Sequence, residues 1–381
     1  MPVEYDLIVI GVGGMGSAVM YRAAKRGLRV LGLEQFGVGH DRGSSHGQTR
    51  IIRQAYYEHP NYVPMARRAF EMWREIEREA QADLLHVTGL LQVGSPGSEL
   101  ITGVRLSAET HQLPVKEMSP AEIEARWPYF KIAPDQVGLF EETAGYLRVE
   151  KCVAQMTRLA MQLGAELRTN TTVEGWSARP DAGVEVRTEA GIVRARRLII
   201  TAGPWSERLL GDLGFKLNVV RKQQAWFQTD RHEVHQGNGA CCFLIDSAEG
   251  CFYGFPQIDL LGMKVAEHSG GQPTASADDL DRETNEDDLT RVRDFLARSF
   301  RLGKHRLVLA SVCMYTRSPD EHFILDKFPD CQQVAFAAGL SGHGFKFAPV
   351  IGDHLVGLLM DERNPDCDFL RLRRFAEKRT V

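Results

Sequence analysis

The feature that most constrains the fold lies near the N-terminus, where the glycine-rich stretch "GVGGMG" (11–16) separates a strand pattern from a helix pattern. The preceding run "YDLIVIG" (5–11) is short, apolar and rich in β-branched residues, which is typical of a buried strand. After the glycines, apolar residues recur at helical spacing until Gly27, and "LRVLGLE" (28–34) has the pattern of a second strand. Together the three segments predict a complete βαβ unit with its crossover helix.

The glycines of this unit have the spacing G-x-G-x-x-G, formed by Gly11, Gly13 and Gly16, and an acid, Glu34, closes the second strand. Bare backbone N–H groups at a helix start can approach a pyrophosphate, and the acid can accept hydrogen bonds from a ribose. A tight strand–helix turn with a solvated glutamate is the alternative. The strand and helix context favours a dinucleotide site, which would also include Gly14, but the motif does not distinguish NAD from FAD.

A chain of 381 residues is too long for one ordinary core, so we expect two domains. Helical periodicity predicts helices at 62–80 and 149–163, whereas 216–228 and 251–256 have the pattern of an antiparallel sheet. The acidic stretch at 276–288 is expected to be a surface connection. The fold class predicted is α/β (α+β overall), with a Rossmann-like cofactor-binding domain and an inserted, mainly antiparallel β-sheet substrate domain. The expected boundaries are 1–85, 150–215 and 315–381 for the discontinuous cofactor domain, and 86–149 and 216–314 for the substrate domain.

Composition excludes several classes of partner. A formal charge of −4 and a pI near 6.3 argue against nucleic acid or an anionic membrane surface. No apolar run approaches the roughly 20 residues of a membrane helix. The chain begins with no basic segment before its first strand, so we expect no secretory signal. Seven cysteines, an odd number, are typical of reduced thiols, so we expect a cytoplasmic protein, and the pair at 241–242 lacks zinc spacing, so we expect no metal.

Two arginines follow the βαβ unit closely. The segment "GSSHGQTRIIR" (43–53) places Arg50 and Arg53 three residues apart, on one face if the segment is helical. A guanidinium can donate two hydrogen bonds to a carboxylate, which predicts an anionic ligand. A surface turn with two solvated arginines explains the spacing equally well.

A second glycine-rich loop, "GLSGHGFKF" (339–347), lies near the other end of the chain and carries His343 and Lys346. A loop without side-chain bulk can approach a cofactor closely. An isolated lysine is more often solvated, but this lysine leads directly into an apolar helix. Cys313, in the strand pattern before this loop, has the ordinary features of a buried thiol.

Several stretches now match one family together and in its order. They run from residue 5 to about 360 and comprise "GVGGMGS", "SSHGQTRIIRQAY", "YVPMARRA", "TAGPW", "FYGFP", "MKVAEHSGGQ", "CMYTRSPDEHFILD" and "GLSGHGFKF". In these motifs the chain resembles the monomeric sarcosine oxidase and N-methyltryptophan oxidase family, within the D-amino-acid-oxidase-like FAD oxidoreductases.

The resemblance implies an FAD whose pyrophosphate lies on Gly11–Gly16 and whose ribose lies on Glu34. It implies covalent attachment of the flavin through Cys313, which reverses the interpretation of that residue as a plain core thiol. Arg50 and Lys264 are expected beside the flavin, with Lys264 as the site of oxygen activation. The second loop, with Gly342 and Gly344, is expected to approach the flavin ring.

For the substrate, the resemblance implies a carboxylate gripped by Arg53 and Lys346. The remaining residues expected around the reacting amine and the ring are Tyr253, Tyr315, His268 and His343. Glu267, beside His268, is an acid to which we assign no role.

The implied reaction is oxidation of the secondary amine of an N-methyl amino acid by O₂. The imine product then hydrolyses to an aldehyde and the amino acid, with H₂O₂ as the other product. The expected partners are a small amine and O₂, and we expect a monomer. An amine dehydrogenase with another electron acceptor, or an oxidase of a cyclic imino acid such as pipecolate or proline, remains an alternative. A nucleotide-binding regulator or an NAD-dependent dehydrogenase explains fewer of the residues.

Overall fold

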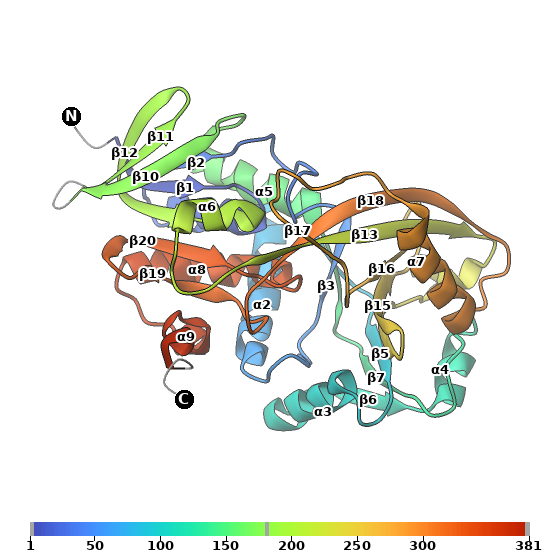
Figure 1. Ribbon diagram of the computed structural model, residues 1–381. Coiled ribbons are helices and arrows are strands. Elements are labelled where there is room, and N and C mark those ends of the chain that lie inside the picture. Colours follow the sequence, from blue (N-terminus) through green and yellow to red (C-terminus); the bar gives the residue numbers. More distant parts are fainter. Residues whose placement is uncertain (1–3, 180–182, 378–381) are drawn as a thin grey trace.

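The computed structural model describes residues 4–179 and 183–377. Residues 1–3, which belong to the stretch expected to lack a secretory signal, lie outside the described residues. The chain forms two large β-sheets with helices packed around them, and one small sheet between (Figure 1). The predicted mixed α/β architecture is therefore confirmed. No helix in the described ranges is long and apolar enough to cross a membrane.

The first large sheet contains the predicted βαβ unit. Helix α1 (Gly14–Lys25) connects strands that lie parallel and adjacent, as the sequence pattern indicates. The eight strands are β1 (Tyr5–Ile10), β2 (Val30–Leu33), β9 (Glu166–Arg168), β10 (Val173–Arg179), β11 (Gly183–Thr188), β12 (Gly191–Ile200), β19 (Ile324–Phe328) and β20 (Cys331–Ala338).

Both faces of this sheet are buried, which explains the continuous apolar run in β1. Leu7 and Val9 belong to the core on one face, and Ile8 and Ile10 to the core on the other. The first face is covered by α1, α2 (Tyr62–Ala80), α5 (Val149–Gln162) and α8 (Ala348–Leu359), and α6 (Ser206–Leu210) packs on the second. The helices predicted at 62–80 and 149–163 are thus confirmed as α2 and α5.

The second large sheet is antiparallel except for one parallel pair, β14 with β5. Its nine strands are β5 (Leu90–Gly94), β6 (Val115–Met118), β7 (Val137–Glu141), β13 (Asn218–Thr229), β14 (Cys242–Ser247), β15 (Gly250–Phe255), β16 (Met263–Glu267), β17 (Gln272–Thr274) and β18 (His305–Arg317). The small sheet contains β3 (Thr49–Ile52), β4 (Leu85–Val87) and β8 (Gly145–Arg148).

Helices that the sequence patterns did not indicate cover this second sheet, namely α3 (Glu99–His111), α4 (Pro120–Arg126) and α7 (Glu286–Ser299). The stretch 276–288 was expected to be a connection throughout, and this prediction is wrong for its last three residues, which begin α7. The Asn285 side chain accepts a hydrogen bond from Asp288 N (2.9 Å) and so caps the helix. Val292 and Phe295 then pack into the core of the second sheet.

Strands β13 and β18 form a long antiparallel pair that runs from beside the first sheet to the far end of the second (Figure 1). The C-terminal part of β18 passes the second glycine loop, where Ser341 N donates to Thr316 O (2.9 Å). This contact brings the residues around Cys313 and Tyr315 against the loop that follows β20.

Candidate functional site

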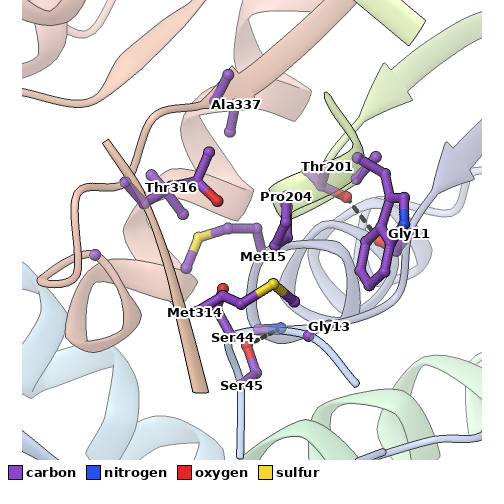
Figure 2. Close-up of a pocket in the computed structure, with 18 of the residues that line it drawn as sticks. Gly11, Gly13, Met15, Ser44, Ser45, Thr201, Pro204, Met314, Thr316 and Ala337 are labelled. Carbon is purple, nitrogen blue, oxygen red and sulfur yellow. Dashed lines mark hydrogen bonds between the residues drawn. The ribbon is translucent and has the colours of Figure 1, made fainter. Parts of the chain in front are cut away.

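Two adjoining cavities lie where the two large sheets meet. The larger encloses about 1290 Å³, partly open to solvent, and is lined by the C-terminal ends of β1, β2, β12 and β20 together with β18 (Figure 2). The smaller encloses about 550 Å³. Their common wall is formed by Arg50, Tyr315, Gly342 and Phe345, so a ligand in one cavity would meet a ligand in the other.

The first glycine loop lies at the wall of the larger cavity. A Cβ on Gly16 would lie 1.8 Å from Gly11 O, and Gly11 has φ +83° with Thr201 O only 2.7 Å from an added Cβ. These two glycines therefore allow helix α1 to pack closely against the loop after β1, and that loop to pack closely against the chain at Thr201. At Gly13, which lines the cavity, a Cβ would meet no atom closer than Ser45 Oγ at 3.6 Å. The bare surface of Gly13 thus faces the space for a ligand, at the positive end of α1.

Glu34 is buried at the end of β2 and lines the same cavity. Its carboxylate accepts hydrogen bonds from Val12 N (2.7 Å) and Phe36 N (3.0 Å), and His40 Nε2 lies 3.4 Å away. Burial opposes ionisation, but the hydrogen bonds from His40 and from the two amides outweigh it and lower the pKa of Glu34. A charged carboxylate in this position can accept hydrogen bonds from ribose hydroxyls.

The second glycine loop forms the opposite wall of the larger cavity. A Cβ on Gly342, which has φ +83°, would lie 2.4 Å from the Tyr315 ring, and a Cβ on Gly344 would lie 2.8 Å from Leu340 Cβ. Both positions therefore require glycine for packing, and both line the cavity. The structure brings this loop and the first loop to one cavity, across more than three hundred residues of sequence.

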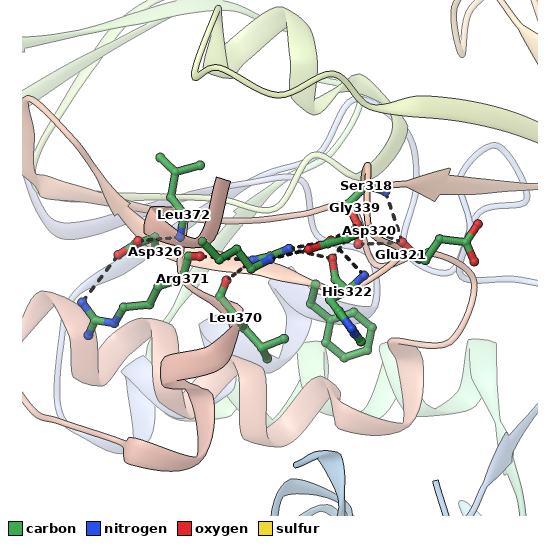
Figure 3. A network of polar contacts seen from close by, with 12 residues as sticks. Ser318, Asp320, Glu321, His322, Asp326, Gly339, Leu370, Arg371 and Leu372 are labelled. Carbon is green, nitrogen blue, oxygen red and sulfur yellow. Dashed lines mark hydrogen bonds and ion pairs between the residues drawn. The ribbon is translucent and has the colours of Figure 1, made fainter. Parts of the chain in front are cut away.

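A polar network holds the second loop from behind (Figure 3). Ser318 N donates to Ser341 Oγ (3.2 Å), and Asp320 binds the Arg374 guanidinium through Nε (2.8 Å) and Nη2 (3.1 Å). Arg374 also donates to the carbonyl oxygen of His322 (3.1 Å). The C-terminal segment is thereby tied to residues 318–326, which support the loop.

Cys313 is fully buried beside the larger cavity. Arg50 Nη2 lies 3.5 Å from its sulfur, and the sulfur lies 3.8 Å from Ser44 O. Burial raises the pKa of a thiol, but His46, Arg50 and Lys264 outweigh it and lower the pKa of Cys313 to about 6. At neutral pH this sulfur is therefore mainly a thiolate, unlike an ordinary core cysteine.

The arginine segment is not helical: its residues Thr49–Ile52 form strand β3, and Arg53 follows directly after it. Arg50 lies in β3, where its guanidinium donates to Thr49 O and Ser44 O (both 2.8 Å) and forms part of both cavities. Lys264, from β16, donates to Gly47 O (2.5 Å) and Thr49 O (3.3 Å) on the far side of this segment. Burial and the Arg50 charge hold the pKa of Lys264 well below its usual range. Lys264 lies close to Cys313 and Arg50, although the described linings of the two cavities do not include it.

The smaller cavity contains the predicted pair of cations. The Arg53 guanidinium forms an ion pair with Glu58 (Nη2–Oε2 2.6 Å) and donates to Gln92 Oε1 (2.8 Å). Lys346 Nζ donates to His343 O (2.8 Å) and Tyr56 Oη (3.2 Å), which are neutral acceptors. Burial and the Arg53 charge lower the pKa of Lys346 to about 7. Lys346 is thus the cation whose charge is less fully compensated.

His343 lines the smaller cavity, yet both of its ring nitrogens are engaged. Nε2 lies 3.1 Å from Glu321 O, which can only accept, so Nε2 carries the proton. Nδ1 lies 2.6 Å from Tyr56 Oη and accepts from that hydroxyl. Burial and the Lys346 charge hold the pKa of His343 well below its usual range, so the ring is neutral. His343 therefore links the loop to Tyr56.

The other predicted residues of the smaller cavity also lie together. His268 Nδ1 is 3.3 Å from Tyr315 Oη, and the Tyr253 ring meets the His268 ring edge to face at 6.3 Å. Burial is the main reason why the pKa of His268 falls to about 3. The lining of the smaller cavity also includes the apolar side chains of Ile51, Leu90 and Leu244.

Sequence reasoning missed several residues of the site. Glu58, Tyr56 and Gln92 contact the two cations, but Glu58 follows Arg53 by five positions in irregular chain, so spacing gave no signal. His46 lies within the quoted arginine segment and could have been found there. Glu267 has a structural explanation: Arg291 of α7 binds its carboxylate through Nε and Nη2 (both 2.7 Å), which ties α7 to β16.

Comparisons with known proteins agree with this geometry. A family model described as FAD dependent oxidoreductase matches residues 6–358. The monomeric sarcosine oxidase of Streptomyces avermitilis is 38% identical over 94% of each chain, and the N-methyl-L-tryptophan oxidase of Yersinia pestis is 35% identical over 98% of this chain and 100% of that protein. Two solved structures share the fold. NikD, an amino acid oxidase, has a TM-score of 0.84 at 22% identity and covers 96% of this chain and 97% of that one. L-proline dehydrogenase from P. horikoshii has a TM-score of 0.86 at 20% identity and 99% coverage of both.

The residues of the larger cavity fit an FAD. The bare surface at Gly13 suits a diphosphate, the ionised Glu34 suits a ribose, and the second loop provides a narrow wall for a flat ring. With a matching family model over most of its length and relatives above 30% identity, this chain belongs to the FAD-dependent oxidoreductase family that includes monomeric sarcosine oxidase and N-methyl-L-tryptophan oxidase.

Proposed function

We propose that this protein is a flavin-dependent amine oxidase that acts on N-methyl amino acids. The observation that carries the proposal is the shared wall of the two cavities, which places a cavity with two buried cations directly beside the FAD cavity. The cations suit the carboxylate of an amino acid. The relatives named above support the N-methyl group as the reacting centre.

Bound FAD would accept the hydride equivalent from the carbon next to the substrate nitrogen. The protein residues would position that carbon. Lys346 and Arg53 would hold the carboxylate at one end of the smaller cavity, while Tyr315 and Gly342 in the shared wall would set the approach to the ring. His268 is neutral near pH 7, and the neighbouring Arg53 and Lys346 charges disfavour a further positive charge on the substrate amine. The cavity therefore favours the unprotonated amine, which is the reactive form.

The test is anaerobic mixing of the purified holoenzyme with sarcosine, N-methyl-L-tryptophan, pipecolate and proline, followed by the visible flavin spectrum. Bleaching by an N-methyl amino acid, with release of formaldehyde, is the expected result. Bleaching by the cyclic imino acids alone would instead make the protein an oxidase or dehydrogenase of those substrates. A spectrum that no amine changes would contradict the proposal.

We further infer that the flavin is attached covalently through Cys313. A thiolate with a pKa of about 6 is a good nucleophile at neutral pH, and Arg50 and Lys264 supply charge around it. After acid precipitation, the yellow colour should stay with the wild-type pellet and move to the supernatant in Cys313→Ser. Cys152→Ser is the matched control, because Cys152 is equally buried but burial raises its pKa well above the usual range. Colour in the wild-type supernatant would refute the attachment.

We also propose that O₂ is the electron acceptor, with Lys264 as the nearby amine whose protonated form would favour its reduction. H₂O₂ should then form in air, and reoxidation of the reduced flavin should slow about 10²–10³-fold in Lys264→Met. Turnover with a quinone but without peroxide would make the protein a dehydrogenase. As a working arrangement, the first large sheet would carry the cofactor domain and the second the substrate domain of a monomeric, cytoplasmic enzyme.

A further inference from the structure

A third buried lysine near the site, Lys222 of β13, has no part in the function proposed above. Lys222 is only 4% exposed to solvent, and the described linings of the two cavities do not include it. Its ammonium group donates to three consecutive carbonyl oxygens, those of His268 (3.1 Å), Ser269 (2.5 Å) and Gly270 (3.2 Å). An ammonium group has three N–H donors, so these carbonyls match its full donor set.

The turn that supplies these carbonyls is wrapped around the lysine. Gly270 and Gly271 have φ +59° and +99°, which only glycine adopts readily. A Cβ on Gly271 would lie 2.9 Å from Lys222 Cδ. The turn therefore passes so close to the lysine stem that no side chain fits between them.

Lys222 contacts both partners of the histidine–tyrosine pair in the smaller cavity. It binds the main-chain oxygen of His268, and its Nζ lies 5.2 Å from the centre of the Tyr315 ring. His268 Nδ1 and Tyr315 Oη meet at 3.3 Å on the cavity side of the same wall. One buried side chain thus supports two cavity residues that come from different strands.

Two other charged side chains lie at this turn or at the end of the strand before it, namely Arg317 and Glu267. Arg317 Nη2 donates to Gly270 O (3.2 Å) and pairs with Glu321 (3.5 Å). Glu267 is bound by Arg291. Of the charged side chains described here, Lys222 is the one with contacts to both His268 and the Tyr315 ring.

We propose that Lys222 is a positioning residue for amine oxidation, which fixes the His268–Tyr315 wall of the substrate cavity against the flavin. The proposal rests on the proposed function, because the wall matters only if the smaller cavity holds the reacting amine. Without the ammonium group, the carbonyl oxygens of His268 and Ser269 lose this donor, Gly270 O keeps only Arg317, and the turn shifts toward water or new partners. A displacement of about 1 Å at a reacting centre costs up to about 10²-fold in rate. Of this wall, only Tyr315 also lines the cofactor cavity, and the reaction with O₂ is assigned to Lys264 instead.

The experiment compares wild-type holoenzyme, Lys222→Met and Arg317→Met by rapid mixing. Arg317→Met is the matched control, since it removes a donor to the same turn without a contact to Tyr315. In Lys222→Met we expect the limiting rate of flavin reduction by an N-methyl amino acid to fall about 10- to 100-fold, with reoxidation by O₂ at the wild-type rate. Arg317→Met should retain both rates. Equal losses in both half-reactions, or no loss, would overturn the proposal.

If Lys222→Met gives no holoenzyme, Gly271→Ala crowds the lysine stem together with Val220 and the Arg221 carbonyl, and should show the same selective loss. Hydrogen–deuterium exchange of the peptide 266–272 supplies a readout that needs no substrate. Exchange should become faster in Lys222→Met and stay close to wild type in Arg317→Met. Unchanged exchange in Lys222→Met would show that the lysine does not hold the turn. If no amine reduces the wild-type flavin, the proposed function fails, and the exchange result still decides whether Lys222 holds the turn.

Discussion

The charge of Lys346 should control how a carboxylate binds, and pH should reveal it. Burial and the Arg53 charge lower the pKa of Lys346 to about 7, so the free enzyme loses this cation as the pH rises through neutrality. A carboxylate would bind the protonated form. Its apparent Kd should therefore be constant below about pH 6 and rise up to tenfold per pH unit above about pH 7. From pH 6 to pH 9 the expected increase is about 90-fold.

The assay is titration of the holoenzyme with a simple carboxylate that lacks an amine, such as propionate, followed by the flavin spectrum at each pH. Such a ligand stays ionised throughout, so its own titration does not contribute. His268, with a pKa of about 3, stays neutral, but Lys222, with a pKa lowered to about 8, also titrates in this range. Lys346→Arg separates the two lysines, because arginine keeps its charge and should give a Kd that is nearly independent of pH.

Lys346→Met should weaken binding at pH 6 by about 10- to 100-fold, the usual value of a hydrogen bond to a charged partner. It should also remove most of the pH dependence. A wild-type Kd that does not change between pH 6 and pH 9 would refute the argument. So would an identical pH profile in Lys346→Arg, because the titrating group would then lie elsewhere.

Three further predictions concern other parts of the structure. Glu58→Gln removes the charged partner of Arg53, so carboxylates should bind more tightly while the Tm of the ligand-free protein falls. The same titration measures the affinity and calorimetry measures the Tm. Unchanged affinity would show that Glu58 does not compete with the ligand. Gly13→Ala should weaken FAD binding with little loss of stability, measured on Cys313→Ser protein. Gly16→Ala should instead destabilise the fold, because its methyl group meets Gly11 O. Equal effects of the two substitutions would contradict the assignment of Gly13 to the diphosphate site. Glu267→Gln should cost about 1 kcal/mol or less in chemical denaturation and leave flavin reduction unchanged, and a large loss of rate would give Glu267 a role in the reaction.

Elements with strong local periodicity could be predicted from the sequence. The first βαβ unit, α2 and α5 each show their pattern within a single window of sequence, and the structure contains all three. Helix α7 was missed because its first turn is acidic and follows a turn-rich stretch. Those acids are a helix-start signal once Asn285 is recognised as the cap.

From residue patterns alone, the site was predictable only as far as its glycines, Glu34 and its cations, and the tyrosines and histidines of the smaller cavity came from the family resemblance. Which groups surround them depends on the register between distant strands. Lys222 lies opposite Cys313 in the β13–β18 pair, and no local pattern specifies that pairing. The low pKa of Cys313 likewise requires Arg50 and Lys264 to converge on it from separate segments. Such properties arise only when the chain has folded.

The passage of β18 along both cavities has a thermodynamic consequence. Met314 and Thr316 line the cofactor cavity, while Tyr315, between them, lines both. If FAD binding orders this strand, it therefore also orders the wall where the amine would bind. By linkage, amine-like ligands should slow the loss of non-covalent flavin from Cys313→Ser protein, and flavin should raise the affinity for those ligands by the same factor. The two binding sites would then share one folding equilibrium, in which a protein without flavin also lacks an ordered substrate cavity.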